Sequence, residues 1–145
     1  MDSVERSVRT HIYQHFRDHG GAPSAEQTAE TLGIATPEVA EGLRRLADSH
    51  TITLLPGEPA VWMAHPFSGV RTDHVVTIGD RTWFANCAWD GLAILALLGD
   101  GSYATQSPID GGDVEWIVEG GNVSPGGVVH LLVPAREFWD DIVHT

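Results

Sequence analysis

The sequence predicts an α+β protein in which a three-helix N-terminal lobe precedes a small mixed sheet packed on one central helix. Three observations predict this order. Apolar residues recur at helical spacing before residue 48, strand-like alternation with turn residues follows from residue 51, and one long apolar run lies between predicted strands. With 42% hydrophobic residues among 145, the chain can bury a real core, which excludes a disordered protein.

Two helices are expected before residue 34. The first covers residues 3–18 and ends at a glycine pair. The second begins after Ser24, which forms a capping box with Gln27, and it ends at Gly33. The apolar stripe of the first helix recurs every four residues and consists of Val4, Val8, Ile12 and Phe16.

A third helix is expected with Thr36 as its N-cap and Pro37 at the first helical position, where a missing N–H costs nothing. Residues 51–64 then predict two short strands around a Pro/Gly turn. Three helices followed by a hairpin are typical of the winged-helix arrangement. The arrangement alone does not establish DNA binding.

The second half of the chain is expected to consist mainly of strands around one helix. It begins with a connector at residues 66–73. The elements expected after it are a hairpin at 74–85 with a Gly-Asp turn, a largely buried helix from Cys87 to Leu98, strands at 114–118 and 128–133, and a short helix or turn at 135–145.

These patterns divide the chain into a winged-helix-like lobe at residues 1–65 and an α+β ligand or catalytic lobe at residues 66–145. The net charge of −12, from 8 basic and 20 acidic residues, argues against nucleic acid as a partner, because phosphate binding needs Lys and Arg. A single cysteine forms no internal disulfide. The sequence shows no signal-peptide pattern and no apolar stretch long enough to cross a bilayer. We therefore expect a cytoplasmic protein with no membrane association.

Cys87 and Asp90 are the first candidates for chemistry. With Asn86 as N-cap, Cys87 would lie in the first turn of the central helix, where unpaired N–H groups favour a thiolate and lower its pKa. Asp90, three residues later, lies on the same helical face and could carry a proton or act as a hard ligand. The alternative is that Cys87 is a small buried apolar residue, as free cysteines often are.

Aromatic residues around Cys87 are candidates for lining a ligand pocket. Trp83, Phe84 and Trp89 bracket the thiol, and five tryptophans is a high count for this length. Aromatic side chains also supply much of any core, so packing is the competing interpretation.

Two other groups of polar residues each allow a functional interpretation and a purely structural one. His11, His15 and His19 recur at i, i+4 and i+8, a spacing that suits a metal site but also an exposed polar stripe. We expect no resident metal or cofactor. Asp140 and Asp141 could supply an acid or base near a pocket or could form a solvated pair.

Three segments together resemble the organomercurial (alkylmercury) lyase family: "HPFSGV" at 65–70, "WFANCAWDGLAILALLG" at 83–99 and "VVHLLVPAREFWDDIVHT" at 128–145. The most specific part is the cysteine-alanine-x-aspartate start of a helix that continues as an aliphatic run ending in Leu-Gly. The resemblance covers essentially the whole chain and implies a helical lobe followed by a small sheet.

The resemblance implies that Cys87 captures the mercury of an organomercurial and that Asp90 delivers the proton that releases the hydrocarbon. Family members use a second cysteine, expected just after a segment like "WDDIVHT", and relatives often carry another where this chain has Ser107. A single thiol does not form the dithiolate that binds mercury strongly. We therefore expect a divergent member lacking the second catalytic cysteine, served by an external thiol or repurposed for another substrate.

Three functions follow as hypotheses. The first is a lyase-like enzyme acting on a small organic molecule through Cys87 and Asp90, by carbon–mercury protonolysis or, slightly favoured by the cysteine count, by a repurposed biosynthetic reaction. The second is a winged-helix regulator that senses a ligand or metal, which the acidic recognition helix with Arg44 and Arg45 disfavours. The third is a non-catalytic binder of a small ligand or soft metal. The sequence predicts neither the substrate nor the oligomeric state.

Overall fold

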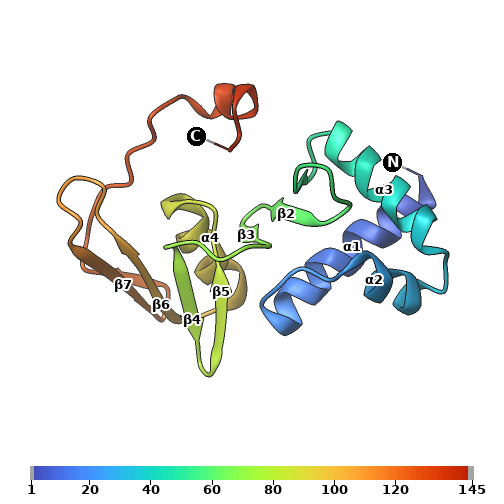
Figure 1. Ribbon diagram of the computed structural model, residues 1–145. Coiled ribbons are helices and arrows are strands. Elements are labelled where there is room, and N and C mark those ends of the chain that lie inside the picture. The colour runs from blue at the N-terminus through green and yellow to red at the C-terminus, as the bar shows by residue number, and fades with distance from the viewer. Residues whose placement is uncertain (1, 144–145) are drawn as a thin grey trace.

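The computed structural model describes residues 2–143 and confirms the α+β class (Figure 1). Three helices come first, a three-stranded sheet follows, and a five-stranded sheet with one helix completes the fold. The elements are α1 (Ser3–His19), α2 (Ala25–Leu32), α3 (Thr36–Asp48), β1 (Thr53–Leu54), β2 (Val61–Ala64), β3 (Phe67–Ser68), β4 (Val75–Ile78), β5 (Arg81–Phe84), α4 (Ala88–Leu98), β6 (Gly101–Gln106), β7 (Asp113–Glu119), β8 (Asn122–Ser124) and the 3-10 helix η1 (Ala135–Asp140).

The helix starts follow local capping signals. The predicted capping box of Ser24 and Gln27 is present at α2, and Asp2 forms a second box with Glu5 at α1. The predicted N-cap of α3 is wrong by one residue: Ala35 is the cap, and Thr36 is the first helical residue. Ala35 has extended backbone angles while its carbonyl already accepts the first helical hydrogen bonds, so the proline still falls in the first turn, where it is tolerated.

The predicted connector at residues 66–73 contains a strand. Within it β3 pairs antiparallel with β2, so that Met63 faces Ser68 and Ala64 faces Phe67. The side chain of Phe67 is buried, which holds this two-residue strand against the core although a proline and a glycine flank it. The helices and this sheet follow the predicted order, and the winged-helix comparison stays a prediction.

The five-stranded sheet has the order β5-β4-β6-β7-β8, and every strand pair in the described part of the chain is antiparallel, so the predicted mixed sheet is wrong. The β4–β5 hairpin with its Gly79–Asp80 turn is confirmed. The central strand β6 was not expected, because "GSYATQ" lacks apolar alternation.

The strand predicted at residues 128–133 is also wrong, because the partner of β7 is β8. Gly120 and Gly121 both have positive φ, which suits a two-residue turn that returns the chain directly into β8. The segment after β8 is irregular and leads to η1, which confirms the predicted short C-terminal helix over residues 135–140.

Helix α4 packs on β4 and β6 and is only partly buried. Ile94 and Leu95 face the core, whereas Trp89 and Leu97 are 62% and 65% exposed, so the prediction of a largely buried helix is wrong. Because the sequence of α4 is aliphatic throughout most of its length, it does not indicate which side of the helix faces solvent.

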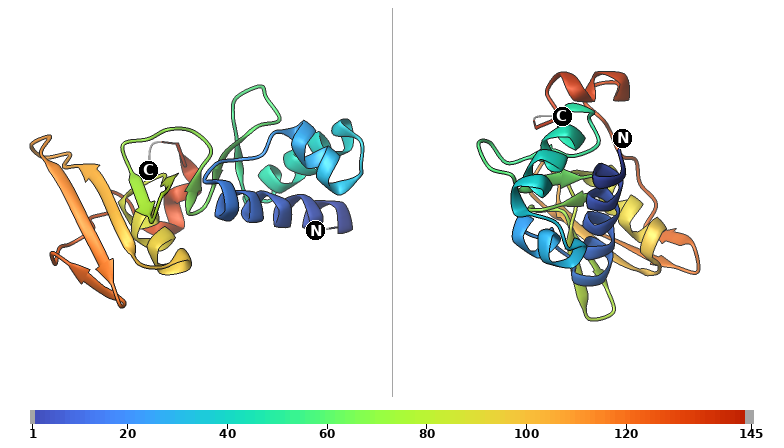
Figure 2. Two further views of the ribbon diagram at one scale, coloured as in Figure 1. Left: turned by 90° about the horizontal axis from the view of Figure 1, so that it is seen from below. Right: turned by 90° about the vertical axis from the view of Figure 1, so that its right-hand side faces the viewer.

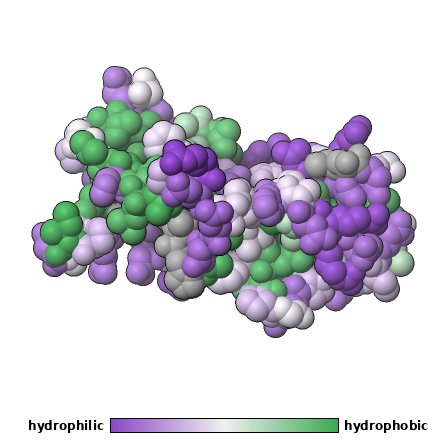
Figure 3. All heavy atoms as spheres, turned by 90° about the horizontal axis from the view of Figure 1, so that it is seen from above, coloured by the Kyte–Doolittle hydropathy of each residue, from purple (hydrophilic) through white to green (hydrophobic). Residues whose placement is uncertain are grey.

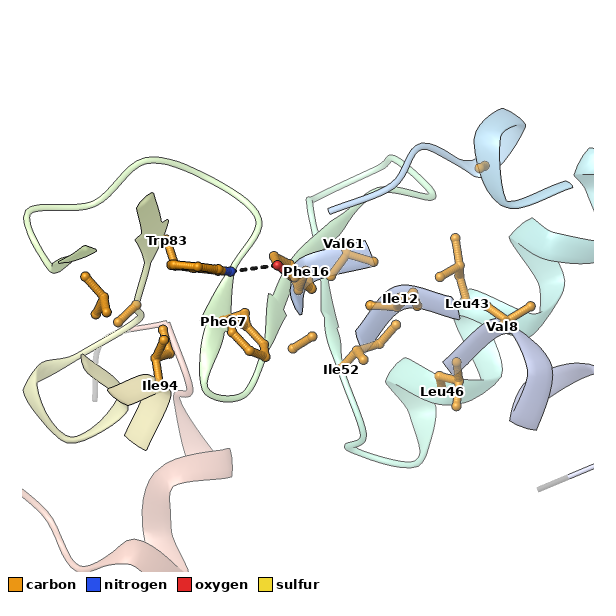
Figure 4. Close-up of a cluster of buried hydrophobic side chains, with 14 of the residues drawn as sticks. Val8, Ile12, Phe16, Leu43, Leu46, Ile52, Val61, Phe67, Trp83 and Ile94 are labelled. Atoms are coloured by element: carbon orange, nitrogen blue, oxygen red, sulfur yellow. Dashed lines mark hydrogen bonds between the residues drawn. The ribbon is translucent and has the colours of Figure 1, made fainter. Parts of the chain in front are cut away.

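One hydrophobic cluster joins the helical part to the β4–β8 sheet (Figure 4). In the view, the side chains of Val8 and Leu43 lie at the helical end and Ile94 lies at the other, with Phe67 and Phe16 between them. The rings of Phe16 and Phe67 stack at 5.1 Å. The division at residue 65 stays a prediction, and the core runs across it.

Apolar side chains gather on the surface of the C-terminal half, whereas the helical half is mainly hydrophilic on the same face (Figure 3). The exposed apolar residues between positions 109 and 132 are Ile109, Ile117, Val123, Val128, Leu131 and Leu132. None of the helices in residues 2–143 has the length and apolarity needed to cross a membrane.

Replacing Gly91 by Ala is expected to destabilise the protein by about 1–3 kcal/mol, because overpacking a filled core forces its neighbours to move. A Cβ at Gly91 would lie 2.5 Å from the ring of Tyr103, which is fully buried. Gly42 is the matched control: a Cβ there meets Val8 at 3.5 Å, so Gly42→Ala should be neutral or stabilising by up to about 1 kcal/mol. Urea unfolding of both variants tests this, and equal effects would contradict it.

Candidate functional site

Cys87 is the N-cap of α4, so the cap lies one residue later than the predicted Asn86, and the backbone of Cys87 is extended. The side chain is half-buried beside the backbone N–H groups of Trp89 and Asp90. Burial raises the pKa of the Cys87 thiol, and the negative charge of Asp90 raises it further, although these N–H groups act in the opposite direction. The predicted lowering of the pKa is therefore wrong, and the thiol holds its proton more firmly than an ordinary cysteine.

Asp90 lies in the first turn of α4 with only 6% of its surface exposed. Its Oδ2 accepts a hydrogen bond of 2.9 Å from Asn86 Nδ2 and lies 3.1 Å from His65 Nδ1. Because a carboxylate only accepts, this geometry assigns the proton to Nδ1 of His65. The carboxyl group is thus fixed by two side-chain donors next to the thiol.

Asn86 does not cap α4 as predicted, because its amide is used elsewhere. Besides Asp90, Nδ2 lies within 3.4 Å of the carbonyl of Pro66 and 3.2 Å of the carbonyl of Phe67. Asn86 therefore ties the start of α4 to the β2–β3 turn and orients Asp90. This role is not visible in the sequence, since the interaction joins segments about 20 residues apart.

His65 is the functional candidate that the sequence analysis missed, although it begins the quoted segment "HPFSGV". Three parts of the chain meet at it: the phenol of Tyr13 donates to its carbonyl at 3.3 Å, its ring contacts Asp90, and Trp139 of η1 lies edge-to-face 6.2 Å away. Trp139 also stacks on His50 at 4.5 Å. Among the described residues, the buried Nε2 of His65 has no hydrogen-bond partner.

A second polar cluster lies on the sheet side of α4. His74 Nδ1 lies 2.7 Å from the phenol oxygen of Tyr103 and 3.1 Å from Thr105 Oγ1. Burial raises the pKa of Tyr103 to about 12, and the negative charges of Cys87 and Asp90 act in the same direction. Burial lowers the pKa of His74, so a protonated phenol donates to a neutral imidazole.

The structure places the three predicted aromatic residues in different environments. Trp83 is 3% exposed and its Nε1 donates to the carbonyl of Phe16 at 2.7 Å, so its ring has no free face for a ligand. Phe84 is half-buried under the guanidinium of Arg71. Trp89, two residues after Cys87, is exposed, and its predicted role in lining a pocket stays a proposal.

Ser107 follows the end of β6, where its Oγ accepts from the N–H of Ile109 at 3.3 Å in a local turn. The imidazoles of His11, His15 and His19 lie side by side on α1, but the described residues contain no group of three side chains able to hold a metal ion. Asp140 ends η1 exposed to solvent, and it is the adjacent Trp139 that reaches His65.

Replacing Asp90 by Asn is expected to lower the pKa of Cys87, because it removes the carboxylate charge that opposes ionisation of the thiol. Only the thiolate reacts with iodoacetamide. The half-point of the alkylation rate against pH should therefore lie above that of an ordinary cysteine in the wild type and shift downward in the variant. An unchanged or higher half-point would show that Asp90 does not act on the thiol.

A comparison with solved structures supports the α+β fold, and a comparison of sequences gives one further relative. The mercury-bound crystal structure of MerB2 matches with a TM-score of 0.67 at 24% identity, covering 86% of this chain and 60% of that one. A succinyl-diaminopimelate desuccinylase from Methylobacterium sp. (strain 4-46) is 31% identical over 121 residues, which are 80% of this chain but 27% of that protein. The chain thus spans less than two thirds of the length of either protein.

The family comparison covers the part of the chain that carries Cys87 and Asp90. The model of the MerB alkylmercury lyase family matches residues 67–145, more than half of the chain, with Cys87 and Asp90 inside the match. The protein therefore belongs to the alkylmercury lyase family.

Proposed function

We propose that Cys87 and Asp90 act together on a small organic molecule, with carbon–mercury protonolysis as the reaction. One observation carries this proposal: a buried carboxyl group, fixed by Asn86 and His65, lies in the first helical turn beside a half-buried thiol. A thiol is a soft ligand suited to mercury, and a carboxyl group held in place can transfer a proton. Family membership supports the same chemistry.

The proposed reaction has two balanced steps. In the first, the sulfur of Cys87 bonds to the mercury of R–Hg–X, the anion X leaves, and the thiol proton passes to the carboxylate of Asp90. In the second, that proton moves to the carbon atom, the carbon–mercury bond breaks with its electron pair on carbon, and R–H leaves. Mercury(II) remains on sulfur and Asp90 is again a carboxylate, so no atom changes oxidation state.

The raised pKa of Cys87 fits the first step, because a thiol that keeps its proton at neutral pH delivers it when mercury displaces it. The 145 residues contain one cysteine, so an external thiol is proposed to supply the second sulfur that removes mercury. A repurposed reaction on another electrophile, slightly favoured by the sequence, uses the same pair and remains the alternative proposal.

The regulator hypothesis has less support from the structure. The two arginines of α3 are engaged within the protein, since Arg44 pairs with Glu41 and Arg45 lies 3.2 Å from Asp2 and 3.4 Å from Glu5. Arginines held by carboxylates are poorly placed to neutralise phosphates.

Incubation with a phenylmercury salt and excess external thiol tests the proposed function. We expect benzene, measured by gas chromatography, to form in proportion to protein and above the rate with thiol alone. Protein alkylated beforehand at Cys87 should give only the thiol-alone rate. If mercury binds to Cys87 without benzene release, the protein is a soft-metal binder or acts on another electrophile, and protonolysis is wrong.

A further inference from the structure

A hollow lies outside the Cys87 site, between α1 and the C-terminal end of α4. Its volume is about 400 Å³. Arg6, Arg9 and Tyr13 contribute to one wall, all from one face of α1, and Leu97 contributes to the other. In the left view of Figure 2, α4 lies close to the C-terminal end of α1.

The charge of this groove is opposite to that of the protein. The chain has a net charge of −12, yet the described lining residues include three of its eight basic residues and no acidic one. Arg17 pairs with Asp18 at 2.7 Å. Arg6 and Arg9 have no ion-pair partner within 4.0 Å among the described residues.

The opposite wall of the groove is apolar. Phe67 lies there with Leu97 and Leu98, and Leu97 leaves an aliphatic side chain largely in water at the end of α4. The guanidinium of Arg9 lies 5.7 Å from the centre of the Tyr13 ring, which holds this cation near the groove. Cations at one wall and apolar carbon at the other match a molecule with one anionic end and one apolar end.

We propose that this groove binds a small amphiphilic organic anion, with its carboxylate or equivalent group on Arg6 and Arg9 and its apolar part on Leu97 and Leu98. Guanidinium groups bind such anions through charge-assisted hydrogen bonds. Covering Leu97 removes apolar surface from water. The surrounding negative charge disfavours polyanions, so the occupant carries little charge beyond this one group.

The groove shares a wall with the candidate active site without being part of it. Tyr13 lines the groove and donates to the carbonyl of His65, and the carbonyl of Phe67 lies near the amide of Asn86. The inference does not depend on the proposed reaction, because the groove uses neither Cys87 nor Asp90.

Isothermal titration with three probes tests the proposal: decanoate, 1-decanol and acetate. We expect decanoate to bind at one saturable site and more tightly than either other probe. Equal binding of decanol would show an apolar patch only, and equal binding of acetate would show an anion site only. Either result, or no binding of decanoate, would overturn the proposal.

Variants locate the binding site. Arg6→Gln with Arg9→Gln should weaken decanoate binding by about 10-fold or more, because both charge-assisted contacts are lost. Arg81→Gln, an exposed arginine on β5, is the matched control and should bind like the wild type. Circular dichroism establishes that each variant is folded. Equal affinity of the double variant and the wild type would place any binding elsewhere and contradict the proposal.

Discussion

Replacing Asp90 by Asn is expected to reduce hydrocarbon release by about 10²- to 10⁴-fold, the usual contribution of a positioned proton donor. The amide has nearly the same shape as the carboxyl group, and its oxygen can still accept the hydrogen bonds from Asn86 and His65. It cannot accept the thiol proton and pass it to carbon. The variant should therefore still bind the organomercurial through Cys87 and stop there.

Two measurements separate capture of the organomercurial by Cys87 from release of the hydrocarbon. Mass spectrometry of the intact protein should show one R–Hg adduct on Asp90→Asn, while gas chromatography shows little hydrocarbon. Cys87→Ser should give neither adduct nor product. Asp113→Asn, an exposed carboxylate on β7, is the matched control and should release hydrocarbon at the wild-type rate. If Asp90→Asn releases hydrocarbon within about threefold of the wild type, Asp90 is not the proton donor.

The parts of the fold that were predicted are those with local signals. The capping box at Ser24 and the two-residue turn at Gly79–Asp80 are set by residues within three or four positions of one another. The strand β6 has no such signal, because Tyr103 becomes a strand residue only through pairing with β4 and β7 and through packing against Gly91. Tertiary contacts decide such a segment.

The difference between local and long-range signals also explains which parts of the site could be predicted. The spacing of Cys87 and Asp90 is visible in the sequence, whereas the contact between Asp90 and His65 joins residues 25 positions apart. The direction of the Cys87 pKa was predicted wrongly because only the helix terminus was considered. In the structure, burial and the carboxylate of Asp90 outweigh the N–H groups at that terminus.

His65 is expected to be a positioning residue for Asp90. Replacing it by Leu removes the donor at 3.1 Å and should lower kcat by about 10- to 100-fold, because a small displacement of a proton donor is costly. KM should change little, since Cys87 captures the substrate. His65→Gln retains a side-chain donor and should recover part of the lost kcat. Packing alone does not explain such a recovery, because Gln does not restore the imidazole ring that contacts Trp139.

Steady-state rates of hydrocarbon release by both variants measure this effect. His130→Leu, an exposed histidine in the irregular segment before η1, is the matched control and should keep the wild-type kcat. If His65→Leu keeps kcat within twofold, the hydrogen bond to Asp90 has no part in catalysis. If Leu and Gln lower kcat equally, His65 acts through the contact of its ring with Trp139 and not through its proton on Nδ1. Recovery by Gln alone assigns the effect to the donor that fixes Asp90.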